Sequence, residues 1–262
     1  MGNAGSFVAA SSVCSGGPSS AVVTGATISP RALPKGALVC LFGAVMVFQP
    51  RANHPYAHAA RFPGEGDVDI HSLMPGEGPV EIEIGPGRGG FLFERAAVVP
   101  HHRLLGLEIR LKWSAIVDER LHKAGLGARA RVLNTDAREA LGRLRPDGSI
   151  AAFFLHFPDP WWKKKHAKRL VMNPDLLDEI ARLLQPGGEF YVQTDVEDRA
   201  LEYEAQISEH AAFEPAGDVE GSARMEENPY GARSPREHHA IRDGLPVTRL
   251  RYRRRTAVPV TT

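Results

Sequence analysis

The chain has 262 residues, of which 43% are hydrophobic and 24% are charged, and its formal net charge is +1. This apolar content excludes disorder throughout the chain, and no apolar run reaches the ~18–20 residues that a membrane-spanning helix needs. Only two cysteines occur, Cys14 and Cys40, which argues against a disulfide scaffold and against a cysteine-ligated zinc site.

The first 64 residues differ in composition from the rest, because they contain no Asp or Glu. We predict that residues 1–45 are an extension that is disordered, serves in targeting, or lies upstream of a true start at Met46. The apolar segment 36–48 has the length of a signal-peptide core, but it lies far from the N-terminus for one. Residues 46–67 are predicted to lead into one globular domain that spans residues 68–262.

Five short apolar runs, each followed by an amphipathic stretch, occupy the chain from Val80 onward. The runs at 80–84, 103–109, 130–134, 150–157 and 189–194 predict strands, and the stretches at 91–99, 111–125, 137–144, 174–184 and 196–210 predict helices. Repetition of strand and helix is typical of an α/β fold, in which a parallel sheet carries helices on both faces.

The remaining C-terminal segments predict a loop and one more strand. Residues 228–246 are polar and contain prolines and glycines, which favours a mobile loop. Residues 248–255 have alternating arginines, which indicates a last strand with Arg249, Arg251 and Arg253 on one face. Two interpretations stay open for these arginines: they protect an edge strand from pairing, or they bind phosphate.

Each of the five predicted strands ends in or near an acidic residue. In an open parallel sheet, ligands bind beyond the carboxyl ends of the strands, so residues at these positions are candidates for a binding site. The five carboxylates are Glu83, Glu108, Asp136, Asp159 and Asp195.

The segment after the first predicted strand is rich in glycine. Gly85, Gly87 and Gly90 satisfy the pattern G-x-G-x-x-G, which lets the backbone turn tightly and lets a ligand approach closely. The glycines alone do not separate NAD from S-adenosylmethionine. Glu83 favours S-adenosylmethionine, because a carboxylate here would repel the pyrophosphate of NAD but would suit a ligand with an ammonium group and a sulfonium.

Glu108 and Asp136 suit the same ligand. A carboxylate at the end of the second strand, such as Glu108, accepts hydrogen bonds from ribose hydroxyls, and Asp136 is placed to accept one from an adenine amino group. Each also has a simpler interpretation, in which Glu108 is a solvated helix cap and Asp136 is the N-cap of the helix that begins at Ala137.

The most specific segment is FPDPWWKKKHAKR at residues 157–169. Prolines on both sides restrict the backbone of Asp159, which indicates a carboxylate held rigidly at a strand end. Trp161 and Trp162 offer flat apolar faces on which nucleobases stack, and the five cations that follow attract phosphates. In the alternative interpretation, the tryptophans belong to the core and the lysines to a solvated loop.

These motifs resemble those of the bacterial tRNA (guanine-N7)-methyltransferase family. EIGPGRGGF resembles the cofactor motif of that family, GLEIRLKW its second-strand motif, FPDPWWKKKHAKR its signature and QTD at 193–195 its later substrate motif. The resemblance runs from about Asn53 to Thr248. In that family a threonine is usually followed three residues later by glutamate, whereas Thr248 is followed there by Arg251.

The resemblance implies a Rossmann-like class I methyltransferase with a mostly parallel seven-stranded sheet. It implies methyl transfer from S-adenosylmethionine to N7 of guanine in tRNA, at position 46, by a cytoplasmic monomer without a metal ion. Asp159 would serve catalysis and cofactor binding, and Lys163, Asp195 and Thr248 would bind the substrate. The cofactor-binding set would be Glu83, Gly85, Gly87, Glu108, Asp136 and Asp159.

Three other functions were weighed against this one. A small-molecule or protein methyltransferase explains the glycines and Glu108 but leaves the tryptophans and lysines unexplained. An NAD-dependent oxidoreductase does not need Glu83 and shows no candidate proton-relay residue. A non-enzymatic RNA-binding relative is suggested by Arg251 alone.

Overall fold

The structure is a computed structural model that describes residues 54–158 and 171–256. Within it, residues Pro50–Thr262 form one compact unit. The predicted extension at 1–45, the residues Asp159 and Lys163, and the paired tryptophans lie outside the described residues.

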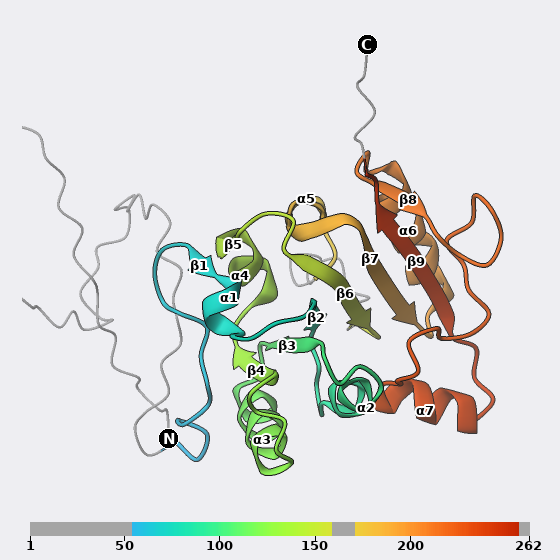
Figure 1. The fold of residues 1–262 in the computed structure, drawn as a ribbon. Coiled ribbons are helices and arrows are strands. Elements are labelled where there is room, and N and C mark those ends of the chain that lie inside the picture. The colour runs from blue at the N-terminus through green and yellow to red at the C-terminus, as the bar shows by residue number, and fades with distance from the viewer. Residues whose placement is uncertain (1–53, 159–170, 257–262) are drawn as a thin grey trace, which may run out of the picture. The chain divides into compact units, whose positions relative to one another are not determined.

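A seven-stranded sheet forms the centre of this unit, with strand order β4-β3-β2-β6-β7-β9-β8 (Figure 1). Five neighbouring strands are parallel, and β9 pairs antiparallel with both β7 and β8. The mostly parallel seven-stranded sheet expected from the sequence is therefore confirmed. Its strands are β2 (Val80–Ile84), β3 (Arg103–Glu108), β4 (Ala130–Asn134), β6 (Ile150–His156), β7 (Leu184–Thr194), β8 (Phe213–Pro215) and β9 (Thr248–Arg254).

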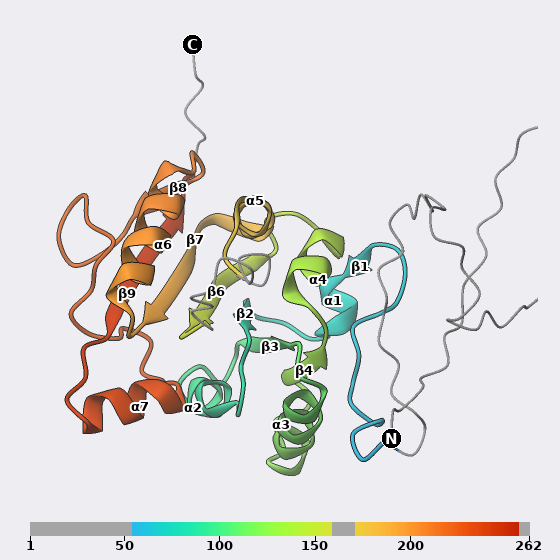
Figure 2. The ribbon, with the colours of Figure 1, turned by 180° about the vertical axis from the view of Figure 1, so that it is seen from behind.

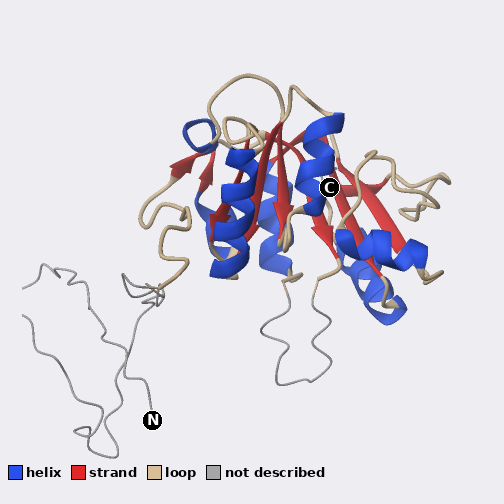
Figure 3. Ribbon diagram, turned by 90° about the horizontal axis from the view of Figure 1, so that it is seen from below, coloured by secondary structure: helices blue, strands red, loops and turns tan. Residues whose placement is uncertain are grey.

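Helices lie against the sheet in the order that the sequence predicts (Figures 2 and 3). Each of the five parallel strands is followed by a helix before the next strand of the chain begins, and such crossovers allow neighbouring strands to run parallel. None of the helices in the described residues is long and apolar enough to cross a membrane. Their bounds are α2 (Gly90–Val98), α3 (Leu111–Lys123), α4 (Ala137–Arg143), α5 (Pro174–Leu183), α6 (Glu197–Glu209) and α7 (Pro235–Arg242).

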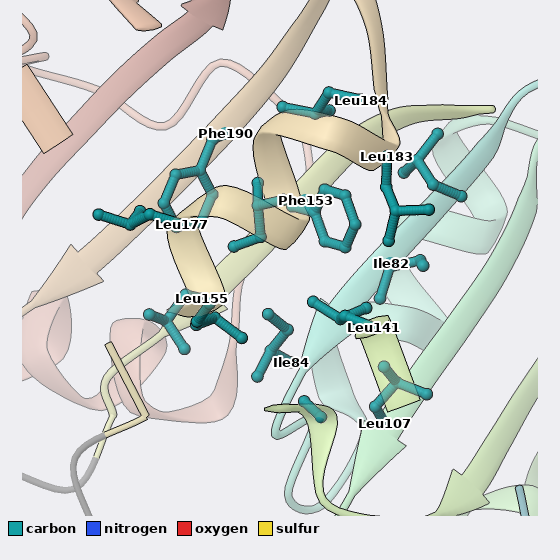
Figure 4. Close-up of a cluster of buried hydrophobic side chains, with 14 of the residues drawn as sticks. Ile82, Ile84, Leu107, Leu141, Phe153, Leu155, Leu177, Leu183, Leu184 and Phe190 are labelled. Carbon is teal, nitrogen blue, oxygen red and sulfur yellow. The ribbon is translucent and has the colours of Figure 1, made fainter. Parts of the chain in front are cut away.

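The largest hydrophobic cluster lies between the sheet and the helices α4, α5 and α6 (Figure 4). Successive side chains of a strand point to opposite faces, so Ile82 and Ile84 of β2 enter this cluster while Glu81 and Glu83 point to the other face. Leu141 of α4 and Leu177 of α5 pack against them. Full burial of each such side chain contributes about 1.5–3 kcal/mol.

A short lead-in and a second, two-stranded sheet complete the compact unit. β1 (Val68–Asp69) pairs in parallel with β5 (Leu144–Arg145), and α1 (Ile70–Leu73) follows β1. The lead-in also reaches the main sheet, because Arg61 forms a bridge to Asn134 and Phe62 packs in the large cluster.

The loop prediction for residues 228–246 is wrong over residues 235–242, which form α7. Ser234 is the N-cap of this helix, and its hydroxyl accepts a hydrogen bond from the backbone N–H of Glu237 at 3.2 Å. Pro235 occupies the first turn, where proline needs no hydrogen-bond partner. Serine followed three residues later by glutamate is a helix-start pattern, and it was the signal in the sequence.

The last strand forms as predicted, but β9 is not an edge strand, because β8 covers its outer side. Its arginines bind protein groups instead. Arg249 donates to Glu237 at 2.9 Å and 3.0 Å, Arg251 donates to the carbonyl of Ala216 at 2.6 Å, and Arg253 donates to Glu189 at 3.2 Å. The edge-protection interpretation is therefore wrong. The side chains of Arg249 and Arg251 form hydrogen bonds with other groups of the protein.

Candidate active site

A cavity of about 560 Å³ opens where β2, β6 and β7 end. Four loops line it, at residues 85–88, 156–158, 195–196 and 234–236, together with Glu83 and Arg110. The position matches the expectation for a parallel sheet, in which the carboxyl ends of the strands face the ligand. Of the predicted site residues, Glu83, Gly85, Gly87 and Asp195 line this cavity.

The glycine loop that follows β2 adopts a conformation that other residues rarely reach. Gly85 has φ +70° and Gly87 has φ +54°, so both occupy the left-handed region. The loop is also packed closely, since a Cβ on Gly90 would lie 2.6 Å from Pro235 Cγ of α7. This contact holds the start of α7 against the start of α2 and closes one side of the cavity.

Glu108, at the end of β3, lies beneath this loop and holds it. Its Oε2 accepts the backbone N–H of Gly87 at 2.8 Å, and its Oε1 accepts the backbone N–H of Arg110 at 2.8 Å and Arg110 Nε at 3.1 Å. The side chain is buried and does not line the cavity in the described residues. Glu108 therefore fixes the glycine loop through its backbone.

Asp136 and Thr248 lie away from the cavity wall. Asp136 is the N-cap of α4, as the simpler interpretation expected, and accepts the backbone N–H of Arg138 at 3.0 Å. Burial acts to raise the pKa of Asp136, but hydrogen bonds from the side chain and backbone of Arg138 lower it overall. The Thr248 hydroxyl donates to Glu197 at 2.9 Å, and this bond is the main cause of a lowered pKa at Glu197.

Glu83 and His156 form a buried pair at the floor of the cavity. His156 Nδ1 lies 2.8 Å from Glu83 Oε1, and both side chains are almost fully buried. Phe91 packs against the imidazole with a centroid distance of 4.4 Å. Glu83 Oε2 and His156 Nε2 are also buried, and neither has a hydrogen-bond partner within the described part of the chain.

Asp195 follows β7 and is paired across the cavity with α7. Arg236 Nε donates to Asp195 Oδ2 at 2.9 Å, and Arg236 Nη2 contacts the same oxygen. Phe157, in the loop after β6, has φ +46°, the only positive φ of a non-glycine residue that the described ranges contain. Such strained positions concentrate at functional sites, and Phe157 lines the cavity.

Sequence reasoning missed Ser234 and Arg236, which line the cavity, and Glu237 next to them. Ser234 and Glu237 are a hydroxyl and a carboxylate residue three positions apart. This is the spacing of threonine and glutamate that the family resemblance led us to expect at Thr248 and residue 251. Glu237 is fully buried and accepts from Arg249 and from Asn228 Nδ2 at 2.8 Å. Of the serine and glutamate in the first turn of α7, Ser234 therefore lines the cavity, and Glu237 is buried behind it.

Comparison with known proteins places these features in a family. Residues 77–250 match the family model described as "Putative methyltransferase". The chain is 37% identical over 174 residues to a tRNA (guanine-N(7)-)-methyltransferase of Myxococcus xanthus, covering 66% of this chain and 82% of that protein. It is 31% identical over 191 residues to the protein of that name from Nitrosococcus oceani, covering 73% of this chain and 78% of that protein.

The chain belongs to the tRNA (guanine-N7)-methyltransferase family. Its fold is the Rossmann-like fold of class I methyltransferases. A crystal structure of the 16S rRNA methyltransferase KamB has the same fold, with a TM-score of 0.50, 18% sequence identity and coverage of 71% of this chain and 92% of that one.

The cavity fits S-adenosylmethionine on its own chemistry. The orphaned carboxylate oxygen of Glu83 is an acceptor that a ligand ammonium satisfies, and the left-handed glycines leave the loop without side chains at Gly85 and Gly87. No cluster of three or more acidic, histidine or cysteine side chains suited to a metal ion occurs in residues 54–158 and 171–256.

Proposed function

We propose that this chain transfers the methyl group of S-adenosylmethionine to N7 of guanine in tRNA, at position 46. Family membership supports the reaction, and the orphaned Glu83 carboxylate beside the glycine loop is the observation that carries it to this chain. An acceptor buried without a partner is costly, so its presence in a cavity indicates a ligand that supplies a donor.

The cofactor is held by residues at the ends of β2, β3 and β4. Glu83 accepts from the ammonium group, and Gly85 and Gly87 give the backbone its close approach. Glu108 holds the glycine loop through Gly87 and is assigned to the ribose hydroxyls, and Asp136, the N-cap of α4, is assigned to the adenine amino group. Asp159 completes this set; it follows Pro158, which lines the cavity.

The chemistry demands alignment more than proton transfer. N7 of guanine carries a lone pair and no proton at neutral pH, so no base has to remove one. Asp195 and Asp159 accept hydrogen bonds from the donor groups of guanine and stabilise the positive charge that methylation creates on the ring. Lys163 and Thr248 contact the tRNA, and the cavity keeps the reacting atoms together.

The same reasoning extends to the state of the enzyme. We infer an enzyme that works without a metal ion, because a neutral nitrogen that attacks the methyl group of a sulfonium and expels a neutral thioether requires no Lewis acid. The family resemblance supports a monomer. A tRNA substrate places it in the cytoplasm.

The direct test incubates the purified chain with S-adenosylmethionine labelled in its methyl group and with bulk tRNA. Label recovered as 7-methylguanine at position 46 supports the proposal. Retention of tRNA without transfer would identify an RNA-binding relative, and label in small molecules with no affinity for tRNA would identify a small-molecule methyltransferase. Asp159→Ala should lower turnover more than cofactor affinity, and unchanged turnover would refute the catalytic role of Asp159.

A further inference from the structure

Unpartnered polar atoms gather at one end of the sheet. Three of the buried side-chain atoms that lack a hydrogen-bond partner among the described residues lie here, namely Glu83 Oε2, His156 Nε2 and Gln193 Oε1. They belong to the adjacent strands β2, β6 and β7, and His156 stands opposite Gln193 in the register of β6 and β7. Native proteins leave few such atoms unpaired, so their concentration here indicates a site built for a ligand.

The hydrogen bond between His156 and Glu83 indicates which of these groups donates and which accepts. A carboxylate only accepts, so the proton of this bond is assigned to His156 Nδ1. Glu83 Oε2 and Gln193 Oε1 are acceptors to which no described group donates, which suits a cationic ligand group with several N–H donors.

We propose that His156 is a positioning residue that orients Glu83 toward the ammonium group of the cofactor. By donating to Oε1, His156 turns the other oxygen, Oε2, toward the ligand and prevents the carboxylate from rotating. Phe91 and Phe154 stack around the imidazole and hold its plane, with centroid distances of 4.4 Å and 5.8 Å. This inference rests on the proposed function, because it assumes that S-adenosylmethionine is the ligand.

The test compares two variants that separate the hydrogen bond from the ring. His156→Phe keeps an aromatic ring against Phe91 but removes the donor, and His156→Asn removes the ring but keeps an N–H near the position of Nδ1. Binding is measured by calorimetry with two probes. S-adenosylhomocysteine carries the amino-acid group, and 5′-methylthioadenosine lacks it.

We expect His156→Phe to weaken S-adenosylhomocysteine binding roughly tenfold to a hundredfold, the effect of losing a hydrogen bond to a charged group. His156→Asn should restore affinity to within about threefold of the unmodified chain, and both variants should bind 5′-methylthioadenosine unchanged. In methylation assays His156→Phe should raise KM for S-adenosylmethionine more than it lowers kcat.

Three results would overturn the role of His156. The first is unchanged binding of S-adenosylhomocysteine by His156→Phe. The second is an equal loss of affinity for both probes, and the third is failure of His156→Asn to restore affinity. The second and third results would indicate that lost packing, and not the lost hydrogen bond, causes the effect. If the unmodified chain binds neither probe, the proposed function itself fails, and the positioning role falls with it.

Discussion

Arg236 of α7 holds the carboxylate of Asp195 across the mouth of the cavity, with Nε 2.9 Å from Oδ2. The two residues are 41 positions apart in the sequence, and both line the cavity. Asp195 is mostly buried while Arg236 is more than half exposed. The pair therefore fixes the orientation of Asp195, as the substrate role that we propose for it requires.

Replacing Asp195 should affect the tRNA reaction specifically. Asp195→Asn is expected to lower kcat/KM for tRNA by roughly a hundredfold, because the charge that faces the methylated ring is lost. Binding of S-adenosylhomocysteine should stay the same. The partner Arg236 is exposed, so urea denaturation should show a change below about 1 kcal/mol. A comparable loss of cofactor affinity would contradict a substrate role.

Arg236 should act on the reaction through Asp195. Arg236→Gln is expected to lower kcat/KM for tRNA by about tenfold, because Asp195 loses the two contacts that orient it. The double variant should have the same kcat/KM for tRNA as Asp195→Asn alone, because the arginine then has no carboxylate to orient. Steady-state kinetics of the four proteins measure this coupling, and fully additive losses would show that Arg236 acts independently.

Glu108 should be needed for the shape of the glycine loop. In Glu108→Gln the amide group turns a donor toward one of the backbone N–H groups of Gly87 and Arg110, so we expect a loss of about 1–3 kcal/mol in the free energy of unfolding. Binding of S-adenosylhomocysteine should weaken as well. Arg110→Gln is the matched control, because it removes only the bond from an exposed side chain. Equal effects of the two changes would contradict the role of Glu108.

Asp136 should make stability depend on pH on the acid side. Its pKa is lowered in the folded chain, from an ordinary value of 3.8, so the folded state binds a proton less readily than the unfolded state. The stabilisation is therefore complete above the ordinary pKa and is lost as pH falls through the lowered one. Urea denaturation should find Asp136→Asn less stable than the unmodified chain at neutral pH, and the difference should shrink as the pH falls below 3.8.

The N-cap role of Asp136 is tested separately from its charge. Asparagine is as good an N-cap as aspartate, whereas Asp136→Ala removes the cap and should cost about 0.5–2 kcal/mol even where the carboxyl is protonated. If the Asn and Ala variants had the same free energy of unfolding at every pH, the cap would contribute nothing.

The lysines at 163–165 should contribute to tRNA binding through phosphate contacts. Replacing all three by alanine is expected to weaken binding and to reduce the slope of log affinity against log salt concentration by roughly two to three. Filter binding over a range of salt concentrations measures the slope. Lys123→Ala is a control on α3, where the ammonium group already pairs with Glu119 at 2.6 Å. A slope as steep as that of the unmodified chain would exclude this segment as a phosphate contact.

Local sequence patterns were sufficient to predict the parallel core. Strand bounds at Val80–Ile84 and Ala130–Asn134 agree with the prediction, because apolar runs and glycine turns are local signals that sheet formation reinforces. The loop after β2 and its preceding Glu83 were also found in this way, since the glycines mark left-handed backbone and the carboxylate marks the ligand charge.

Which side chains face the cavity and which support it could not be predicted from local patterns, because it depends on contacts between distant segments. Helix α7 and its Ser234 cap reach the site because β9 inserts antiparallel between β7 and β8, a register set by contacts far apart in the sequence. Likewise Glu108 supports the loop, and the contact between His156 and Glu83 spans 73 residues. No local pattern encodes such pairings, because each depends on how the whole sheet brings distant residues together.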